Sequence, residues 1–328
     1  MRRFNAILTA LLALQLILVA VVFGSRSQAG NADNGPYLDL KQNALTSLQV
    51  SDNKGSSLTL KQGDNGWRVP ARDDFPADSQ HLDQLINGLN GVKPALPVAV
   101  SKDARQRFQV AKDHFNRHLV FHDAKGVVAD LYLGKNAGAN RVYARLAGKD
   151  AIQAITLPMW QASTQAADWL DHNYLNARPA QLTRITLPQA TLTRQGPQWQ
   201  VKGLADGKVT DHNKVQALLG HLRTLAWSHL LGGTDSVTLP AKATFSVTVM
   251  PKSNKAVAYR FYQDSQNGKP RWRVNRSDSP YVFTVDSARI TPLRDATVAG
   301  LSMDKPAKKD SGKDAPPKAA ATPSTPAR

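Results

Sequence analysis

Apolar and polar residues alternate in two short stretches that each centre on a tryptophan. The stretches read GWRV at 66–69 and QWQV at 198–201. A period of two is typical of half-buried β-strands, with the tryptophan inward. The neighbouring residues match as well, since LTLKQGDNGWRV at 58–69 aligns with ATLTRQGPQWQV at 190–201 without a gap. We interpret this match as a tandem duplication.

A helical pattern follows each tryptophan strand. The segment DSQHLDQLINGLNGV begins at Asp78, and DHNKVQALLGHLRTL begins at Asp211. In both segments apolar residues stand four, seven, eight, eleven and fourteen positions after the aspartate. This spacing places them on one face of an α-helix, and an aspartate at the start suits the role of N-cap. We therefore expect Asp78 and Asp211 to be structural helix caps.

The complete pattern predicts an α+β fold with two tandem copies of a mostly antiparallel sheet, each covered by one main helix. After each helix, alternating runs such as HLVFHD and TFSVTVM predict about four further strands. We assign the first copy to residues 37–175 and the second to residues 176–301. The segment MWQASTQAADWL at 159–170 is expected to form a second short helix that closes the first copy.

The N-terminal segment is strongly apolar, because residues 6–24 contain only Thr9 and Gln15 as polar side chains. A helix of this length spans about 28 Å, close to the thickness of the hydrocarbon core of a bilayer. Residues 1–5 carry two arginines, so we predict a cytoplasmic N-terminus, a single-pass anchor in a bacterial inner membrane, and export of the rest to the periplasm. Residues 25–36 would be a tether. Cleavage as a signal peptide after the small residues at 27–29 is the alternative.

Charge and composition narrow the possible functions. Lys and Arg number 42 against 25 acidic residues, a net charge of +17, and the chain contains neither cysteine nor glutamate. A thiol nucleophile, a disulfide and a cysteine zinc site are therefore excluded. The basic residues are spread along the chain and no RNA-binding motif is present, so we predict no nucleic-acid partner. Residues 302–328, rich in Lys, Pro and Ala, are expected to form a disordered basic tail that attracts anionic lipid or cell wall weakly.

Candidate chemistry is sparse. His114, His118 and His122 stand four apart, but in a strand the outer two would lie about 26 Å apart, too far to share one ion. We therefore predict no metal site, no cofactor and no catalytic residues, although Asp130 or Asp168 are the candidates if the chain is an enzyme. Four aromatic residues could line a ligand or partner surface, and core packing is the competing explanation. They are Trp67, Trp199, Tyr143 and Trp272.

Several motifs resemble one bacterial family. They are the tryptophan strand before an Asp-capped helix, RFQV at 107–110, DAKGVVADLYLGKNAGANRVYARL, and WLDHNYLNARPAQLTRITL. Together they resemble the family of domain of unknown function 4340 over roughly residues 40–300. Two departures concern the local turns: Gln109 stands where the family pattern has glycine, and the second copy lacks a counterpart of LGK at 133–135.

The resemblance implies a membrane-anchored envelope protein, in many cases encoded beside transporters similar to gliding-motility ABC systems. It implies no known catalytic residues. We therefore expect a non-enzymatic periplasmic binding or scaffolding subunit, accessory to an ABC-type transport system, whose partners are integral membrane subunits. The alternatives are an envelope enzyme that acts on cell-wall glycan or peptide, and a periplasmic ligand-binding sensor module.

Overall fold

The computed structural model describes residues 15, 37–93, 95–253, 255–266 and 268–306. The chain divides into two compact units. The first comprises Met1–Leu175 and Leu230–Thr238, and the second comprises Asn176–His229 and Leu239–Arg328. The predicted anchor at 6–24, apart from Gln15, and the predicted tether at 25–36 lie outside the described residues.

Within the described part of the chain, no helix has the length and apolar character needed to cross a bilayer.

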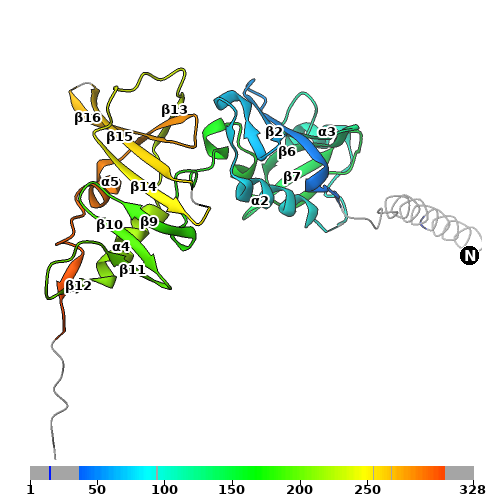
Figure 1. Ribbon diagram of the computed structural model, residues 1–328. Helices are drawn as coiled ribbons and strands as arrows, with labels where there is room; N and C mark the ends of the chain where they lie inside the picture. The colour runs from blue at the N-terminus through cyan, green and yellow to red at the C-terminus, as the bar shows by residue number, and fades with distance from the viewer. Residues whose placement is uncertain (1–14, 16–36, 94, 254, 267, 307–328) are drawn as a thin grey trace, which may run out of the picture. The chain divides into compact units, whose positions relative to one another are not determined.

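The first unit contains an eight-stranded sheet in which all recorded neighbours run antiparallel (Figure 1). Its strand order is β4-β3-β2-β1-β5-β6-β7-β8. The strands are β1 (Leu45–Ser51), β2 (Ser57–Gly63), β3 (Gly66–Val69), β4 (Phe75–Pro76), β5 (Arg117–Asp123), β6 (Gly126–Asn136), β7 (Arg141–Leu146) and β8 (Gln153–Thr156). A buried core lies on this sheet, with Leu48, Leu60, Phe121 and Leu131 fully enclosed.

Between residues 37 and 175 the structure describes the α-helices α2 (Ser79–Asn90) and α3 (Lys102–Phe108). The N-cap of α2 is Asp78, whose carboxylate accepts hydrogen bonds from the backbone N–H groups of Gln80 and His81. The apolar stripe of α2 is buried at Leu82, Leu85, Ile86 and Leu89. Short 3-10 helices complete the unit: η1 (Gln42–Ala44), η2 (Pro70–Arg72), η3 (Met159–Ala162) and η4 (Ala166–Trp169).

The prediction of one short helix at 159–170 is wrong, because this segment forms the two separate 3-10 helices η3 and η4. Ser163 between them is extended, with ψ 140°. Its hydroxyl donates to the Asp168 carboxylate at 2.5 Å and accepts from the Gln165 N–H at 3.0 Å. Serine offers the backbone such local bonds in place of a helical ladder, and this explains the interruption.

The other eight-stranded sheet has the order β11-β10-β9-β14-β15-β16-β17-β13, and all of its residues belong to the second unit except Leu230–Gly233 of β13, which are counted with the first. Its strands are β9 (Leu182–Thr186), β10 (Thr191–Gln195), β11 (Gln198–Val201), β13 (His229–Gly233), β14 (Phe245–Pro251), β15 (Val257–Gln266), β16 (Lys269–Arg276) and β17 (Tyr281–Val285). The helices are α4 (His212–Arg223), α5 (Ser287–Arg294) and the 3-10 helix η5 (Pro179–Gln181). Asp211 caps α4 and accepts from the N–H groups of Asn213 and Lys214.

A separate two-stranded sheet pairs β12 (Lys208–Thr210) with β18 (Ser302–Asp304). The prediction that the disordered tail begins at residue 302 is therefore wrong. The pairing sequesters backbone groups of β18, and an ion pair of 2.8 Å joins Lys208 Nζ to Asp304 Oδ1. Residues 307–328 lie outside the described residues.

The strand orders of the two sheets correspond. In the first sheet β3-β2-β1 is followed by β5-β6-β7-β8, and in the second β11-β10-β9 is followed by β14-β15-β16-β17. In both units a capped helix, α2 or α4, comes in the chain between these two groups of strands. The fold is thus made of two large, mostly antiparallel sheets with few helices.

Candidate functional site

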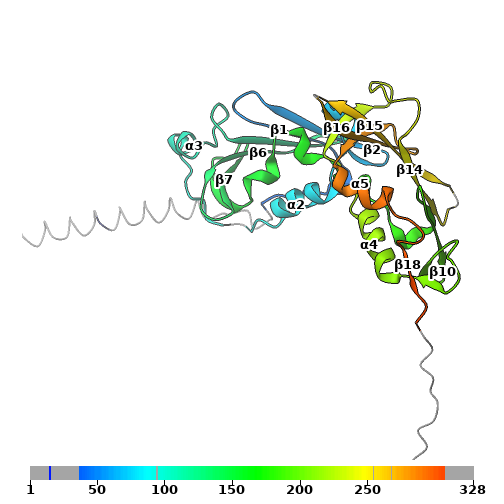
Figure 2. The ribbon, with the colours of Figure 1, turned by 90° about the vertical axis from the view of Figure 1, so that its left-hand side faces the viewer.

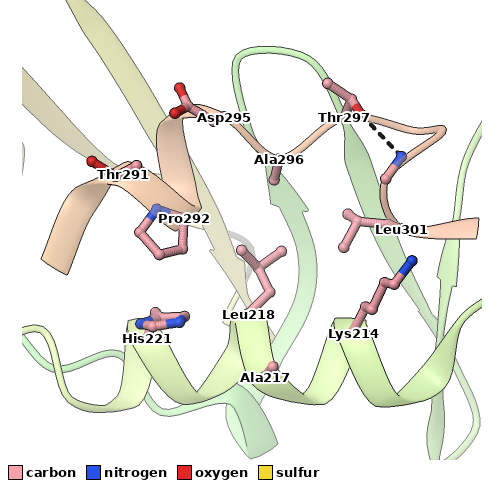
Figure 3. Close-up of a pocket in the computed structure, with 11 residues that line it drawn as sticks. Lys214, Ala217, Leu218, His221, Thr291, Pro292, Asp295, Ala296, Thr297 and Leu301 are labelled. Carbon is pink, nitrogen blue, oxygen red and sulfur yellow. Dashed lines mark hydrogen bonds between the residues drawn. The ribbon is translucent and has the colours of Figure 1, made fainter. Parts of the chain in front are cut away.

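An open groove lies in the second unit between α4 and the chain that runs from α5 to β18, and we call it the α4–α5 groove (Figure 3). Its volume is about 380 Å³, at the lower end of the range typical of ligand pockets. The α4 side presents Lys214, Ala217, Leu218 and His221. Their spacing of three, four and seven positions places them on one helix face.

The opposite wall combines apolar and hydroxyl-bearing residues. Thr291, Pro292 and Asp295 come from the end of α5, and Ala296, Thr297, Gly300 and Leu301 follow. The Thr297 hydroxyl accepts a hydrogen bond of 2.9 Å from the Gly300 N–H, which fixes the turn above the groove (Figure 3). Leu218 and Leu301 are 4% and 6% exposed and form an apolar floor, whereas Ala217 is exposed at the rim.

The charges at the rim of the α4–α5 groove already have partners. The Lys214 ammonium lies 3.6 Å from the Asp211 carboxylate, and Arg294 binds Asp295 through two hydrogen bonds of 2.7 and 2.9 Å. The Arg294 hydrogen bonds lower the pKa of Asp295 below its usual range, so this carboxylate stays ionised. A groove with an apolar floor and internally neutralised charges suits an apolar side chain better than a free ion.

A second cluster lies on one face of the first sheet, and we call it the His118 cluster. His118 Nε2 is 2.7 Å from Asp130 Oδ1, and the imidazole stacks on the Tyr132 ring at 4.3 Å and 7°. The Arg145 guanidinium also packs on Tyr132 and lies 5.0 Å from the centroid of its ring. Burial raises the pKa of Tyr132, and the nearby Asp130 raises it further.

Arg145 holds the loops around the His118 cluster in place. It is 4% exposed, and it donates to the carbonyl oxygens of Val110, Leu146 and Lys149 at 2.7, 3.2 and 3.0 Å. Burial lowers the pKa of Arg145, and the neighbouring Arg105 contributes in the same direction. Because three backbone carbonyls and an aromatic face surround this guanidinium, its role here is to organise the fold.

The His118 cluster does not reproduce a nucleophilic triad. Ser51 stands opposite His118 across β1 and β5, yet no hydrogen bond joins the two side chains among the bonds recorded for the described residues. Nucleophilic catalysis needs that bond together with donors for an oxyanion. Asp168, the other acidic candidate, accepts from the Ser163 hydroxyl and is a structural partner of the η3–η4 turn.

The predicted aromatic surface does not form. Trp67, Trp199 and Trp272 are 7%, 3% and 5% exposed, so the prediction that they line an exposed surface is wrong. Each indole lies in a strand, at a position that points into the core of its own unit. Burial of so large an apolar ring stabilises the fold, which explains why these residues are inside. Tyr143 is half-buried and packs on Phe108 at a ring separation of 4.2 Å.

The three histidines spaced by four do not gather either. His118 and His122 lie in β5, and His114 precedes the strand and hydrogen-bonds to Gln106 at 3.1 Å. Within the described residues no group of three or more His or Asp side chains is placed to hold a metal ion.

The departure at Gln109 lies against the LGK segment of the first copy. Gln109 adopts the left-handed conformation, φ 58° and ψ 47°, at the C-cap of α3, where glycine is usual. The chain at 108–110 then crosses directly over Gly134 of β6. A Cβ at Gly134 would lie 2.0 Å from the Phe108 carbonyl oxygen and 2.8 Å from that of Gln109. In the sequence FQV and LGK are separate segments, and only their contact in the fold explains why β6 has glycine here.

Comparison with known proteins gives one match. A family model described as "Domain of unknown function (DUF4340)" matches residues 67–245, more than half of the chain. The matched region contains α4 and the whole His118 cluster. No curated protein and no solved structure matches this chain.

Proposed function

We propose that this chain, which belongs to the DUF4340 family, is a non-enzymatic binding or scaffolding subunit. It acts at the periplasmic face of a bacterial inner membrane, to which residues 6–24 anchor it. Its partners are integral membrane subunits of an ABC-type transport system. The basic tail adds a weak attraction to anionic lipid or cell wall.

The α4–α5 groove is the observation that carries this proposal. It offers an apolar floor at Leu218 and Leu301, open at the rim beside Ala217. Its volume suits one or two large apolar side chains, the size of the anchor by which a partner segment enters a groove. The charged groups at its rim, Lys214 and Asp295, are already paired within the chain. Such a groove favours a protein segment over a charged small molecule.

We further propose that the two units are duplicates of one α+β module in which a single helix covers the sheet. The corresponding strand orders support the duplication. Figure 2 draws α2 along one side of the first sheet, and the buried stripe of α2 supports its role as a cover. A module of this kind provides a rigid support on which α4 can present the groove.

The test compares two substitutions on the same helix. Ala217 lines the groove, whereas its neighbour Gln216 is exposed and does not line it. Ala217→Arg places a long charged chain at the rim and should abolish co-purification with the transporter subunits after mild-detergent extraction and crosslinking. Gln216→Arg introduces the same arginine, with the same charge and helix propensity, at a position outside the groove. It should leave co-purification unchanged.

The partners must be identified by mass spectrometry as integral membrane subunits of an ABC-type transporter. Equal recovery of these subunits with both variants would show that the groove is not the binding site. If the full-length wild-type protein migrates alone and cleaves a glycan or a peptide, the scaffolding proposal fails. The alternative, an envelope enzyme, then returns with the His118–Asp130 pair as its first candidate.

A further inference from the structure

A strip of exposed apolar side chains borders the first sheet, and we call it the apolar ridge. Leu96, Val98 and Val100 are 79%, 50% and 53% exposed. They alternate with Pro97 and Ala99, which are half-buried. The ridge therefore has the period of an extended strand, but its large apolar side chains face outward. Three exposed apolar side chains at alternate positions of one edge form a continuous strip, and such strips are typical of contact surfaces.

The backbone of the ridge is fixed, so the exposure does not come from a loose loop. The Val98 N–H donates to the Ile152 carbonyl at 2.7 Å, and the Ile152 N–H donates to the Ala99 carbonyl at 2.9 Å. Ile152 itself is fully buried. The Gln153 side chain also reaches the Ala95 carbonyl at 3.4 Å. These bonds hold the segment beside the start of β8 and leave the side chains of the ridge pointing outward.

The ridge lies near the point where the N-terminal segment joins the first unit. Leu40 and Asn90 exchange two hydrogen bonds, of 2.8 and 2.9 Å, between the backbone of Leu40 and the Asn90 side chain. Leu96 follows Asn90 by six positions, so the ridge begins within about 22 Å of Asn90. A flexible linker as long as 25–36 has a root-mean-square length of about 20 Å. A chain anchored through residues 6–24 therefore keeps the ridge within reach of the bilayer surface.

The charges around the ridge suit an anionic surface. Residues 91–107 contain four basic side chains and one acidic side chain, and Lys93 and Lys102 flank the ridge as exposed residues. Apolar side chains between lysines are typical of protein segments that lie in the interface of an anionic membrane. A partner protein would provide an apolar pocket but has no general reason to favour flanking lysines.

We propose that the apolar ridge rests on the lipid bilayer, with Leu96, Val98 and Val100 in the acyl–headgroup boundary and Lys93 and Lys102 at anionic headgroups. This inference rests on the proposed membrane anchor, and it adds an orientation: the β8 edge of the first sheet faces the membrane. The α4–α5 groove belongs to the second unit and is a separate surface.

The absence of cysteine from the chain makes a site-specific test direct. Leu96→Cys in the full chain carries a polarity-sensitive fluorophore, and the protein is reconstituted into vesicles of phosphatidylethanolamine and phosphatidylglycerol. The matched control is Asn53→Cys, exposed in the β1–β2 turn. Five strand spacings, or about 24 Å, separate that turn from the ridge across the sheet.

The label at Leu96 should emit at shorter wavelength than the label at Asn53, and nitroxide-labelled lipid should quench most of its fluorescence. Replacing phosphatidylglycerol by phosphatidylcholine should weaken the quenching at Leu96. An aqueous spectrum at Leu96, equal to that at Asn53, would overturn the proposal. A blue-shifted label that lipid nitroxides do not quench would also overturn it, because protein rather than lipid would then cover the ridge.

Alkaline extraction of the same vesicles separates this inference from the proposed function. If the chain is released, the anchor is wrong and both proposals fail. If the chain is retained but the Leu96 label stays aqueous, the anchor stands and only the orientation is wrong.

Discussion

Gly134→Ala should loosen one corner of the first unit without disturbing the second. Gly134 lies in β6 beneath the chain at 108–110, and a Cβ there would stand 2.0 Å from the Phe108 carbonyl oxygen. Ordinary contact begins near 3.4 Å, so this backbone must move by about 1.4 Å, since a protein core leaves no spare space. The Val110 side chain, 2.8 Å from the same position, must move as well.

The magnitude follows from three contributions. Overpacking a core costs about 1–3 kcal/mol. Displacement of Val110 weakens the 2.7 Å hydrogen bond from the buried Arg145 guanidinium, and a bond to a charged group contributes about 1.5–3 kcal/mol. Alanine recovers about 0.4–1 kcal/mol by restricting the unfolded chain. We expect a net loss of about 3 kcal/mol, which is roughly a 150-fold increase in the opening equilibrium.

Amide hydrogen exchange is the assay, because it reports opening region by region. Protection of residues 102–110 should fall by this factor, while protection of α4 in the second unit stays at the wild-type level. The control is Gly220→Ala in α4, where nothing lies within 4 Å of the added Cβ. There alanine should stabilise the helix by about 0.5–1 kcal/mol. Unchanged protection of 102–110 in Gly134→Ala would refute the argument that this contact dictates glycine.

Three further predictions concern stability. Asp78→Ala and Asp211→Ala should each lower the free energy of unfolding by about 1 kcal/mol through loss of an N-cap, measurable as a shift in urea midpoint. Arg145→Met should cost about 3 kcal/mol, because the buried Val110 carbonyl and the part-buried Leu146 and Lys149 carbonyls lose the donors of this side chain. Amide hydrogen exchange at 108–110 should accelerate, and wild-type rates would contradict the assigned role. The hydrogen bond from Arg271 lowers the pKa of Asp264 below its ordinary 3.8. The contribution of the ionised Asp264 to the free energy of unfolding is therefore fully present above pH 3.8 and is lost as the pH falls below it. Asp264→Asn should reduce the fall in the free energy of unfolding at acid pH, and an unchanged fall would contradict the assignment.

Features that depend on residues close together in the chain could be predicted from the sequence. The helices that begin after Asp78 and Asp211 follow from a local apolar period and a local capping residue. The tryptophan strands likewise follow from alternation in single stretches. The mostly antiparallel pairing in both sheets could be predicted for the same reason, since short strand-like runs separated by turns favour hairpins.

Features made by contacts between distant residues could not be predicted. Gln109 and Gly134 lie 25 positions apart, and no local pattern shows that the backbone at 108–110 crosses Gly134. One wall of the α4–α5 groove comes from α5, and the proline inside this helix, Pro292, is a residue that argues against a helix when only the sequence is considered. The apolar ridge has the alternation of a strand, yet only the bonds to Ile152 show that its apolar side chains face outward.

The pairing of β12 with β18 has a consequence for the time course of synthesis. A chain is synthesised from its N-terminus, so early segments emerge first. The Asp211 N–H at the start of α4 donates to the Leu301 carbonyl at 2.9 Å, and the Lys305 N–H donates to the Gly207 carbonyl at 2.9 Å. These bonds cannot form until the ribosome has made about eighty residues beyond the end of α4 at Arg223. The beginning of α4, and with it one wall of the groove, is therefore completed among the last steps of biogenesis, and a nascent chain stalled before residue 301 should not yet engage a partner there.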